Sequence, residues 1–179
     1  MRRALCVLAV ITVLALSGRP AAAGVTAFEA FERLRSLAGA WEGPIEGQDG
    51  TAAVTYRMIS GGKAVLEILF PGTDHEMLSI YLLDGGELRM THYCAAGNQP
   101  RLRLDRKVST PADLRFVFEG GANLDPAKDG HIHAGRMTFR EDGTMRAAWT
   151  YHKDGKPAGE HVMQVSRVAD PRPATAEAP

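Results

Sequence analysis

The sequence predicts an all-β protein, an antiparallel up-and-down β-barrel of about ten strands with a short N-terminal helix. Three observations lead to this fold class. Runs of about eight residues with alternating apolar and polar side chains occupy most of residues 41–168. Turn-forming sequences separate the runs, and Asp84-Gly85-Gly86 is typical of a tight hairpin. No alternation of strands with helices is present, which argues against a parallel sheet. Because closure removes exposed sheet edges, we expect a closed barrel with room inside for a ligand.

Residues 1–23 have the three-part pattern of a secretory signal peptide. The chain begins Met-Arg-Arg, residues 4–16 are apolar apart from Thr12, and Ala21-Ala22-Ala23 supplies small residues for cleavage. We expect cleavage before Gly24 and an exported protein, periplasmic or secreted; an uncleaved N-terminal anchor is the alternative. The apolar run is shorter than the roughly 20 residues of a membrane span. No second such run follows, so we expect no membrane span in the mature chain.

The mature chain is expected to be mildly acidic. Loss of Arg2, Arg3 and Arg19 from the 21 basic residues leaves 18 against 21 acidic ones, a net charge of −3. This balance gives no basic footprint for nucleic acid. Cys94 stands alone once Cys6 is removed, so no internal disulfide is expected. A free cysteine is usually buried.

Residues 25–38 predict the helix. Its apolar residues recur at helical spacing: Phe28, Phe31, Leu34 and Leu37. Thr26 and Glu29 have the spacing of a capping box at the N-terminus. Gly39 is expected to end the helix.

Ten strands are expected after the helix. Their predicted ranges are 41–47, 52–59, 63–70, 76–83, 87–94, 100–106, 114–119, 131–140, 144–151 and 160–168. Residues 120–130 form the longest predicted loop. The Pro- and Ala-rich tail, residues 169–179, is expected to be disordered.

Gly39-Ala40-Trp41, directly after a short helix, resembles the Gly-x-Trp signature of the lipocalin-like (calycin) barrels. The resemblance implies a lipocalin-like domain over residues 24–168. It also implies that Trp41 closes the bottom of the barrel and that an arginine of the last strand, Arg167, packs across it. A guanidinium over an indole stabilises by on the order of 0.5–2 kcal/mol.

A narrower resemblance covers most of residues 30–168. The segments 91–94, 97–101, 130–133 and 149–150 are similar to those of a family of uncharacterised bacterial exported proteins, which implies a fold and no activity. The nitrobindin-type barrels are similar in strand count and opening motif. They coordinate haem iron through a histidine inside the barrel, so this likeness adds haem as a candidate cofactor.

Strand alternation predicts which side chains point into the barrel. In residues 87–94 the apolar face also carries two polar side chains: Leu88, Met90, His92 and Cys94. In residues 131–140 one face carries His131, His133, Met137 and Phe139. In residues 144–151 one face carries Met145, Ala147, Trp149 and Tyr151. We expect these faces, with His161 at the start of the last strand, to point inward.

The predicted interior is apolar, aromatic and rich in imidazole, which favours a small, largely apolar ligand. The expected binding residues within the barrel are Tyr56, Met90, Cys94, Trp149 and Tyr151, with His92, His131 and His133 as polar anchors. The loop Gly97-Asn98-Gln99-Pro100-Arg101 is either a plain hairpin connection or a rim that presents Asn98, Gln99 and Arg101 to the ligand.

A metal site is the alternative interpretation of the histidines. His131 and His133, two apart on a strand, would project the same way about 7 Å apart. With His92 as a third ligand they would suit zinc or another transition metal. Equally, each imidazole could be hydrogen-bonded inside the cavity.

An enzyme with a histidine general base is a further alternative. Cys94 and His92 lie two apart on one strand, which is awkward for a nucleophile and its base. Glu67 and Glu76 form no recognisable carboxylate pair. Since no nucleotide-binding or nucleophile-elbow motif occurs, we assign no catalytic residue.

Overall fold

The computed structural model describes residues 24–168, which form one α-helix, one short 3-10 helix and ten strands. The elements are α1 (Ala27–Arg35), β1 (Gly39–Pro44), β2 (Thr51–Ile59), η1 (Ser60–Gly62), β3 (Ala64–Leu69), β4 (Met77–Asp84), β5 (Glu87–Tyr93), β6 (Gln99–Leu104), β7 (Asp113–Ala122), β8 (His131–Phe139), β9 (Met145–Lys153) and β10 (Lys156–Arg167). The predicted signal peptide and the predicted disordered tail lie outside the described residues. Within residues 24–168, no helix has the length and apolar character needed to cross a membrane.

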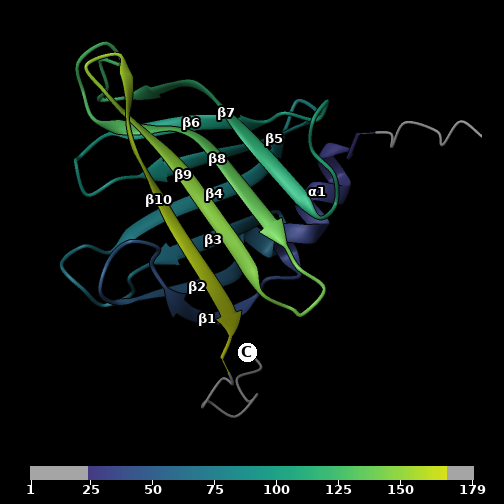
Figure 1. Cartoon of the computed structure of the whole chain (residues 1–179). Coiled ribbons are helices and arrows are strands. Elements are labelled where there is room, and N and C mark those ends of the chain that lie inside the picture. Colours follow the sequence, from purple (N-terminus) through teal and green to yellow (C-terminus); the bar gives the residue numbers. More distant parts are fainter. Residues whose placement is uncertain (1–23, 169–179) are drawn as a thin grey trace, which may run out of the picture.

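The strands close into an antiparallel barrel (Figure 1). Each strand pairs with the next one along the chain, and β10 returns to pair with β1, where Trp41 lies opposite Arg167. The predicted closed up-and-down barrel is therefore confirmed. Closure gives both terminal strands a hydrogen-bonded neighbour, as an antiparallel sheet of this size requires.

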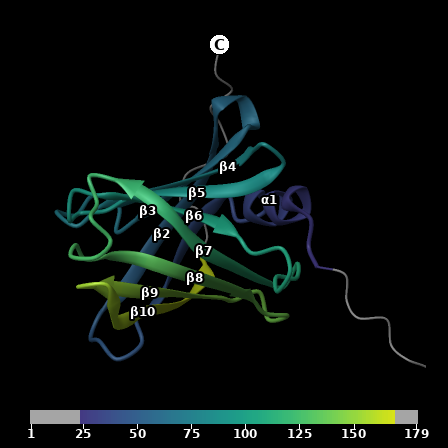
Figure 2. The same ribbon diagram turned by 90° about the horizontal axis from the view of Figure 1, so that it is seen from above.

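Helix α1 packs on the barrel core and lies near β4 and β5 (Figure 2). The predicted capping box is present. Thr26 Oγ1 accepts a hydrogen bond from Glu29 N at 3.1 Å, and Glu29 Oε2 accepts one from Thr26 N at 2.9 Å. The helix ends at Arg35, before the predicted end at residue 38. Its buried residues are Ala27, Ala30, Phe31 and Leu34.

The contact predicted between Trp41 and Arg167 is present at this end of the barrel. The Arg167 guanidinium carbon lies 4.7 Å from the Trp41 ring centroid, and Arg167 also donates to the carbonyls of Ser36 and Ala38. Trp41 Nε1 donates to Leu37 O at 2.7 Å. A Cβ at Gly39 would collide with the Arg167 guanidinium, and Gly39 has a φ of +130°. Glycine is therefore required where the chain enters β1.

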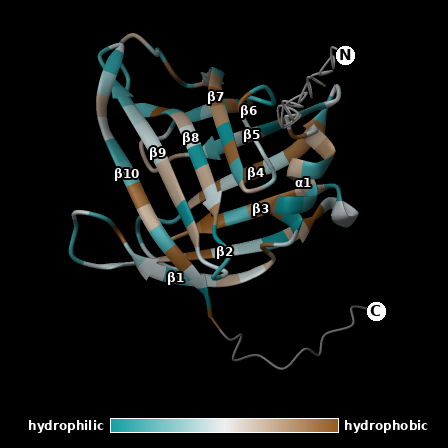
Figure 3. Ribbon diagram, turned by 45° about the vertical axis from the view of Figure 1, so that its right-hand side comes forward, coloured by the Kyte–Doolittle hydropathy of each residue, from teal (hydrophilic) through white to brown (hydrophobic). Residues whose placement is uncertain are grey.

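Apolar and polar residues alternate along the strands (Figure 3), and the inward apolar residues form one core cluster that includes the buried side of α1. Fully buried side chains of this core include Val54, Leu88, Met90, Leu102, Leu104, Leu114, Phe116, Met137, Met145 and Val165.

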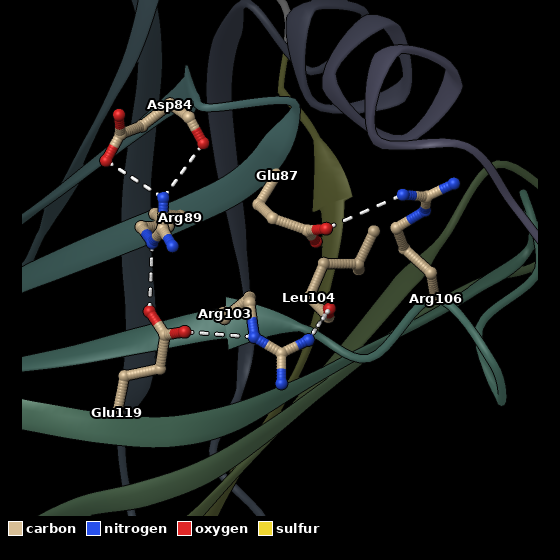
Figure 4. Close-up of polar contacts among 7 residues, drawn as sticks. All are labelled: Asp84, Glu87, Arg89, Arg103, Leu104, Arg106 and Glu119. Atoms are coloured by element: carbon tan, nitrogen blue, oxygen red, sulfur yellow. Dashed lines mark hydrogen bonds and ion pairs between the residues drawn. The ribbon is translucent and has the colours of Figure 1, made fainter.

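Charged side chains lie on the outer surface of β5, β6 and β7 (Figure 4). The Glu119 carboxylate accepts from Arg89 at 3.0 Å and from Arg103 at 2.9 Å, and Arg89 also pairs with Asp84 at 2.9 Å. Such partly exposed pairs each contribute about 0–1 kcal/mol. Arg89 alternates along β5 with the buried Leu88 and Met90, so it lies on the outer side of the strand.

Candidate functional site

A cavity of about 330 Å³ lies at the end of the barrel opposite Trp41. Its lining residues come from the first parts of β2, β4 and β8, the middle of β10 and the last parts of β3, β5 and β9. The β1–β2 and β3–β4 connections, and Cys94 just after β5, add the rest. Small-molecule sites typically have volumes of about 300–1,000 Å³. The cavity is therefore large enough for a small ligand.

The cavity wall is mainly apolar. Its apolar residues are Ile45, Ala52, Leu69, Phe70, Met77, Ile132, Trp149, Val162 and Met163. Its polar residues are Gln48, His75, Ser79, His92, Cys94, Tyr151 and His161. Every side chain in this described lining is thus apolar, uncharged polar or histidine.

Four polar residues form a row across the inner surface of β2, β3, β4 and β5, which we call the polar row: Tyr56, Glu67, Ser79 and His92. Tyr56 lies directly opposite Glu67, Glu67 opposite Ser79, and Ser79 opposite His92. Directly opposite residues project to the same side of a sheet. The strand register therefore brings side chains from four separate segments into contact with one another, and the last two line the cavity.

Glu67 is the fully buried acid of the polar row. Its Oε1 accepts from the Tyr56 hydroxyl at 2.6 Å and its Oε2 from the Tyr81 hydroxyl at 2.9 Å. Burial raises the pKa of Glu67, against the opposing effect of these hydrogen bonds. Burial, followed by the nearby Glu67 charge, raises the pKa of both tyrosines well above the usual value. The carboxyl group is thus satisfied by two phenols, without a cation.

His92 is the polar-row residue most directly suited to contact a ligand. It is 5% exposed, it lines the cavity, and Ser79 Oγ lies 3.1 Å from its Nδ1. Burial lowers the pKa of His92 to about 4, so the ring is neutral near pH 7. Ser79 engages Nδ1, which leaves Nε2 for a molecule in the cavity. An imidazole with so low a pKa is a weak base, so this geometry favours hydrogen bonding over proton abstraction.

His131 and His133, which were expected among the ligand-binding residues, lie outside the cavity wall, next to a β-bulge in β8. The pairing of β8 with β9 shifts between Ile132 and Ala134. Ile132 lines the cavity, whereas His131 and His133 do not. A bulge adds a residue to one strand and interrupts the regular alternation on which the prediction depended.

His131 and His133 instead form a cluster with His152 and Phe118. His131 Nε2 lies 3.1 Å from His133 Nδ1, and the rings of His133 and His152 stack with centroids 3.9 Å apart. Phe118 stacks on His133 at 4.7 Å. Burial lowers the pKa of His133, and the neighbouring imidazoles lower it further.

The predicted metal site of His92, His131 and His133 is therefore not assembled. His92 lies in the cavity wall, and the other two belong to the separate cluster. In the described range 24–168, no group of three or more His, Cys, Asp or Glu side chains is arranged to hold a metal ion.

Four of the other residues predicted to face the interior line the cavity, and two are buried in the core outside its wall. Cys94, Trp149, Tyr151 and His161 line the cavity. Tyr56 and Met90 are buried in the core, outside the lining. Cys94 is a half-buried free thiol whose sulfur accepts from Ala96 N at 3.5 Å.

The loop between β5 and β6 does not line the cavity. Asn98 is buried, and its Nδ2 donates to Gly130 O at 2.8 Å. Gln99 Oε1 accepts from Asn123 Nδ2 at 2.9 Å, and Arg101 is exposed on β6. The loop therefore ties the start of β6 to the connection between β7 and β8. Its predicted contact with a ligand has no support in this geometry.

Sequence reasoning missed Glu67 and Ser79. Both sides of residues 63–70 are largely apolar, so alternation alone does not decide which side faces inward; in the structure Val65 and Leu69 share the inner side with Glu67. A carboxyl group in a strand that is otherwise apolar was the available signal, since an unpaired buried acid is rare.

A scan of protein-family models finds no match to this chain, and neither does a search of curated proteins. The closed ten-stranded antiparallel barrel of residues 24–168 is consistent with a lipocalin-like fold.

Proposed function

We propose that this protein binds a small, largely apolar molecule inside its barrel. The observation that carries the proposal is the cavity of about 330 Å³ with a mainly apolar wall and a few converging polar groups. Such a wall gains free energy by removing apolar ligand surface from water, and its polar groups set the orientation of the ligand. Core residues such as Met90 and Phe116 are buried but do not line the cavity, so they limit the space that a ligand can fill.

Export is part of the same proposal. The pattern of residues 1–23 supports it, and so does the resemblance to bacterial exported proteins. Mass spectrometry of the protein from a secreting host would then find Gly24 as the N-terminal residue. A chain that still begins at Met1 would contradict cleavage.

Ala52→Phe tests the cavity directly. Ala52 is fully buried and lines the cavity, so a phenyl ring would occupy ligand space. N-phenyl-1-naphthylamine, an apolar dye that fluoresces when removed from water, is the probe. We expect saturable binding by the wild type and at least about tenfold weaker binding by the variant, a loss of about 1.4 kcal/mol.

Ala53→Phe is the matched control. Ala53 is the next residue on β2 and projects to the opposite side of the sheet, so its variant should bind the dye as the wild type does. Circular dichroism and thermal unfolding would show that both variants fold. Absence of saturable dye binding by the wild type, or equal binding by both variants, would overturn the proposed site.

Haem is the alternative occupant, supported by the likeness to nitrobindin-type barrels. His92 fits the place of an iron ligand, because it lies in the cavity wall with Nδ1 engaged by Ser79. Haem titration distinguishes the two occupants. A Soret band that is lost in His92→Ala would favour haem, and a band unchanged in that variant would reject His92 as its ligand.

A further inference from the structure

The chemistry of the cavity wall narrows the class of ligand, provided that the proposed binding function holds. The wall offers hydrogen-bonding groups at Gln48, His75, Ser79, His92, Tyr151 and His161, and at the buried Nε1 of Trp149. Its lining side chains are apolar, uncharged polar or histidine throughout the described residues. A ligand carboxylate in this cavity would therefore leave water without meeting a lysine or arginine of the wall. Hydrogen bonds from the wall would replace part of its hydration, but no lysine or arginine of the wall would balance its charge.

His92 does not supply the missing positive charge. Its ring is 5% exposed, and burial lowers its pKa to about 4, so the ring is neutral near pH 7. Because Ser79 Oγ lies 3.1 Å from Nδ1, the ring is held in one orientation. A neutral imidazole in this setting is a hydrogen-bonding partner for an uncharged polar group.

Glu67 disfavours an anion in either protonation state. It lies next to Ser79 in the polar row, and its two oxygens already accept from Tyr56 and Tyr81. As a neutral acid it offers an anionic ligand no attraction. As a carboxylate it would repel one through an interior of low dielectric constant. The conclusion therefore does not depend on which form is present.

We infer that the cavity selects an uncharged apolar molecule that carries one hydroxyl or carbonyl group, which hydrogen-bonds to His92, and that it discriminates against the corresponding carboxylate.

Three ligands with the same ring system test the inference: naphthalene, 2-naphthol and 2-naphthoate, measured by equilibrium dialysis at pH 7.5. We expect 2-naphthol to bind at least about tenfold more tightly than 2-naphthoate, because no lysine or arginine of the wall balances the charge of the carboxylate. We expect it to bind about fivefold more tightly than naphthalene, through a single hydrogen bond.

His92→Leu identifies the anchor. In this variant the advantage of 2-naphthol over naphthalene should disappear, while naphthalene itself binds as before and so reports an intact cavity. His133→Leu, in the separate histidine cluster outside the cavity wall, is the matched control and should keep the advantage.

The dialysis results distinguish the inferred selectivity for an uncharged ligand from the proposed binding function on which it rests. If 2-naphthoate binds as tightly as 2-naphthol, or if His92→Leu keeps the preference for 2-naphthol, the inference is overturned and the apolar cavity stands. If none of the three compounds binds, the proposed function fails and the inference fails with it.

Discussion

At the scale of single residues, Glu67 is the side chain that departs furthest from ordinary sequence expectation. It is fully buried, and its partners are two phenols in place of a lysine or arginine. A buried acid without a cation favours its protonated form, and burial accordingly raises its pKa above the usual value of 4.5.

The raised pKa makes stability depend on pH. Below about pH 4.5 the acid is protonated in both states, so it adds no pH dependence there. Between pH 4.5 and the raised pKa the folded protein holds a proton that the unfolded chain has released, and above the raised pKa it buries a charge. Rising pH therefore lowers the free energy of unfolding, by about 1.4 kcal/mol for each unit of pKa elevation.

Glu67→Gln should remove this dependence, because the amide has similar shape and no charge. Denaturation at pH 5 and pH 8 is expected to show that the variant gains stability relative to the wild type as the pH rises. Glu42→Gln, at an exposed position on β1, is the control. Parallel pH profiles for Glu67→Gln and the wild type would contradict the expected burial penalty.

At the scale of elements, the pairing of β8 with β9 determines which side chains face the cavity. The bulge between Ile132 and Ala134 removes His131 and His133 from the cavity wall. Beyond it, Gly135 lies directly opposite Trp149, whose six-membered ring occupies the place where a Cβ at residue 135 would stand. Glycine at this position allows the Trp149 ring to approach the β8 backbone closely.

Gly135→Ala should therefore strain this pair. An added methyl group in a packed core typically costs about 1–3 kcal/mol, and we expect a loss of that size in the free energy of unfolding. A double-mutant cycle with Trp149→Phe provides the test, because the smaller ring leaves room for the methyl group. If Gly135→Ala costs the same in the Trp149→Phe background as in the wild-type background, the steric explanation is wrong.

At the scale of the whole molecule, the chain closes where the helix, β1 and β10 meet. Arg167 on the last strand stacks on Trp41 and donates to carbonyls at the end of the helix segment, Ser36 and Ala38. One side chain thus connects the two ends of the described chain. The same arrangement closes the end of the barrel opposite the cavity.

Arg167→Ala is expected to lower the free energy of unfolding by about 1.5–3 kcal/mol, the usual range for hydrogen bonds to a charged group. Arg167→Lys should recover only a minor part of this stability. A lysine lacks the planar guanidinium group, which stacks on Trp41 and donates to the carbonyls at the same time. Urea denaturation measures both. Because Arg167 lies at the opposite end of the barrel, dye binding by the folded Arg167→Lys variant should match that of the wild type. If Arg167→Lys were as stable as the wild type, a positive charge alone would explain the role of Arg167, and the argument from guanidinium shape would be wrong.

The sequence by itself determined the features that depend on local pattern. The capping box of Thr26 and Glu29, the order and number of strands, and the inward face of β5 could all be predicted because helix ends, turns and strand alternation are encoded by neighbouring residues. The contact of Trp41 with Arg167 was predicted from the resemblance to lipocalin-like barrels.

The tertiary structure alone decided the composition of the site. The polar row exists because the register of four strands places Tyr56, Glu67, Ser79 and His92 opposite one another. A register shift of one residue moves every side chain to the other side of a strand, and no single strand contains that information. The bulge in β8 separated His131 and His133 from His92 for the same reason, since a bulge is defined by the pairing of two strands.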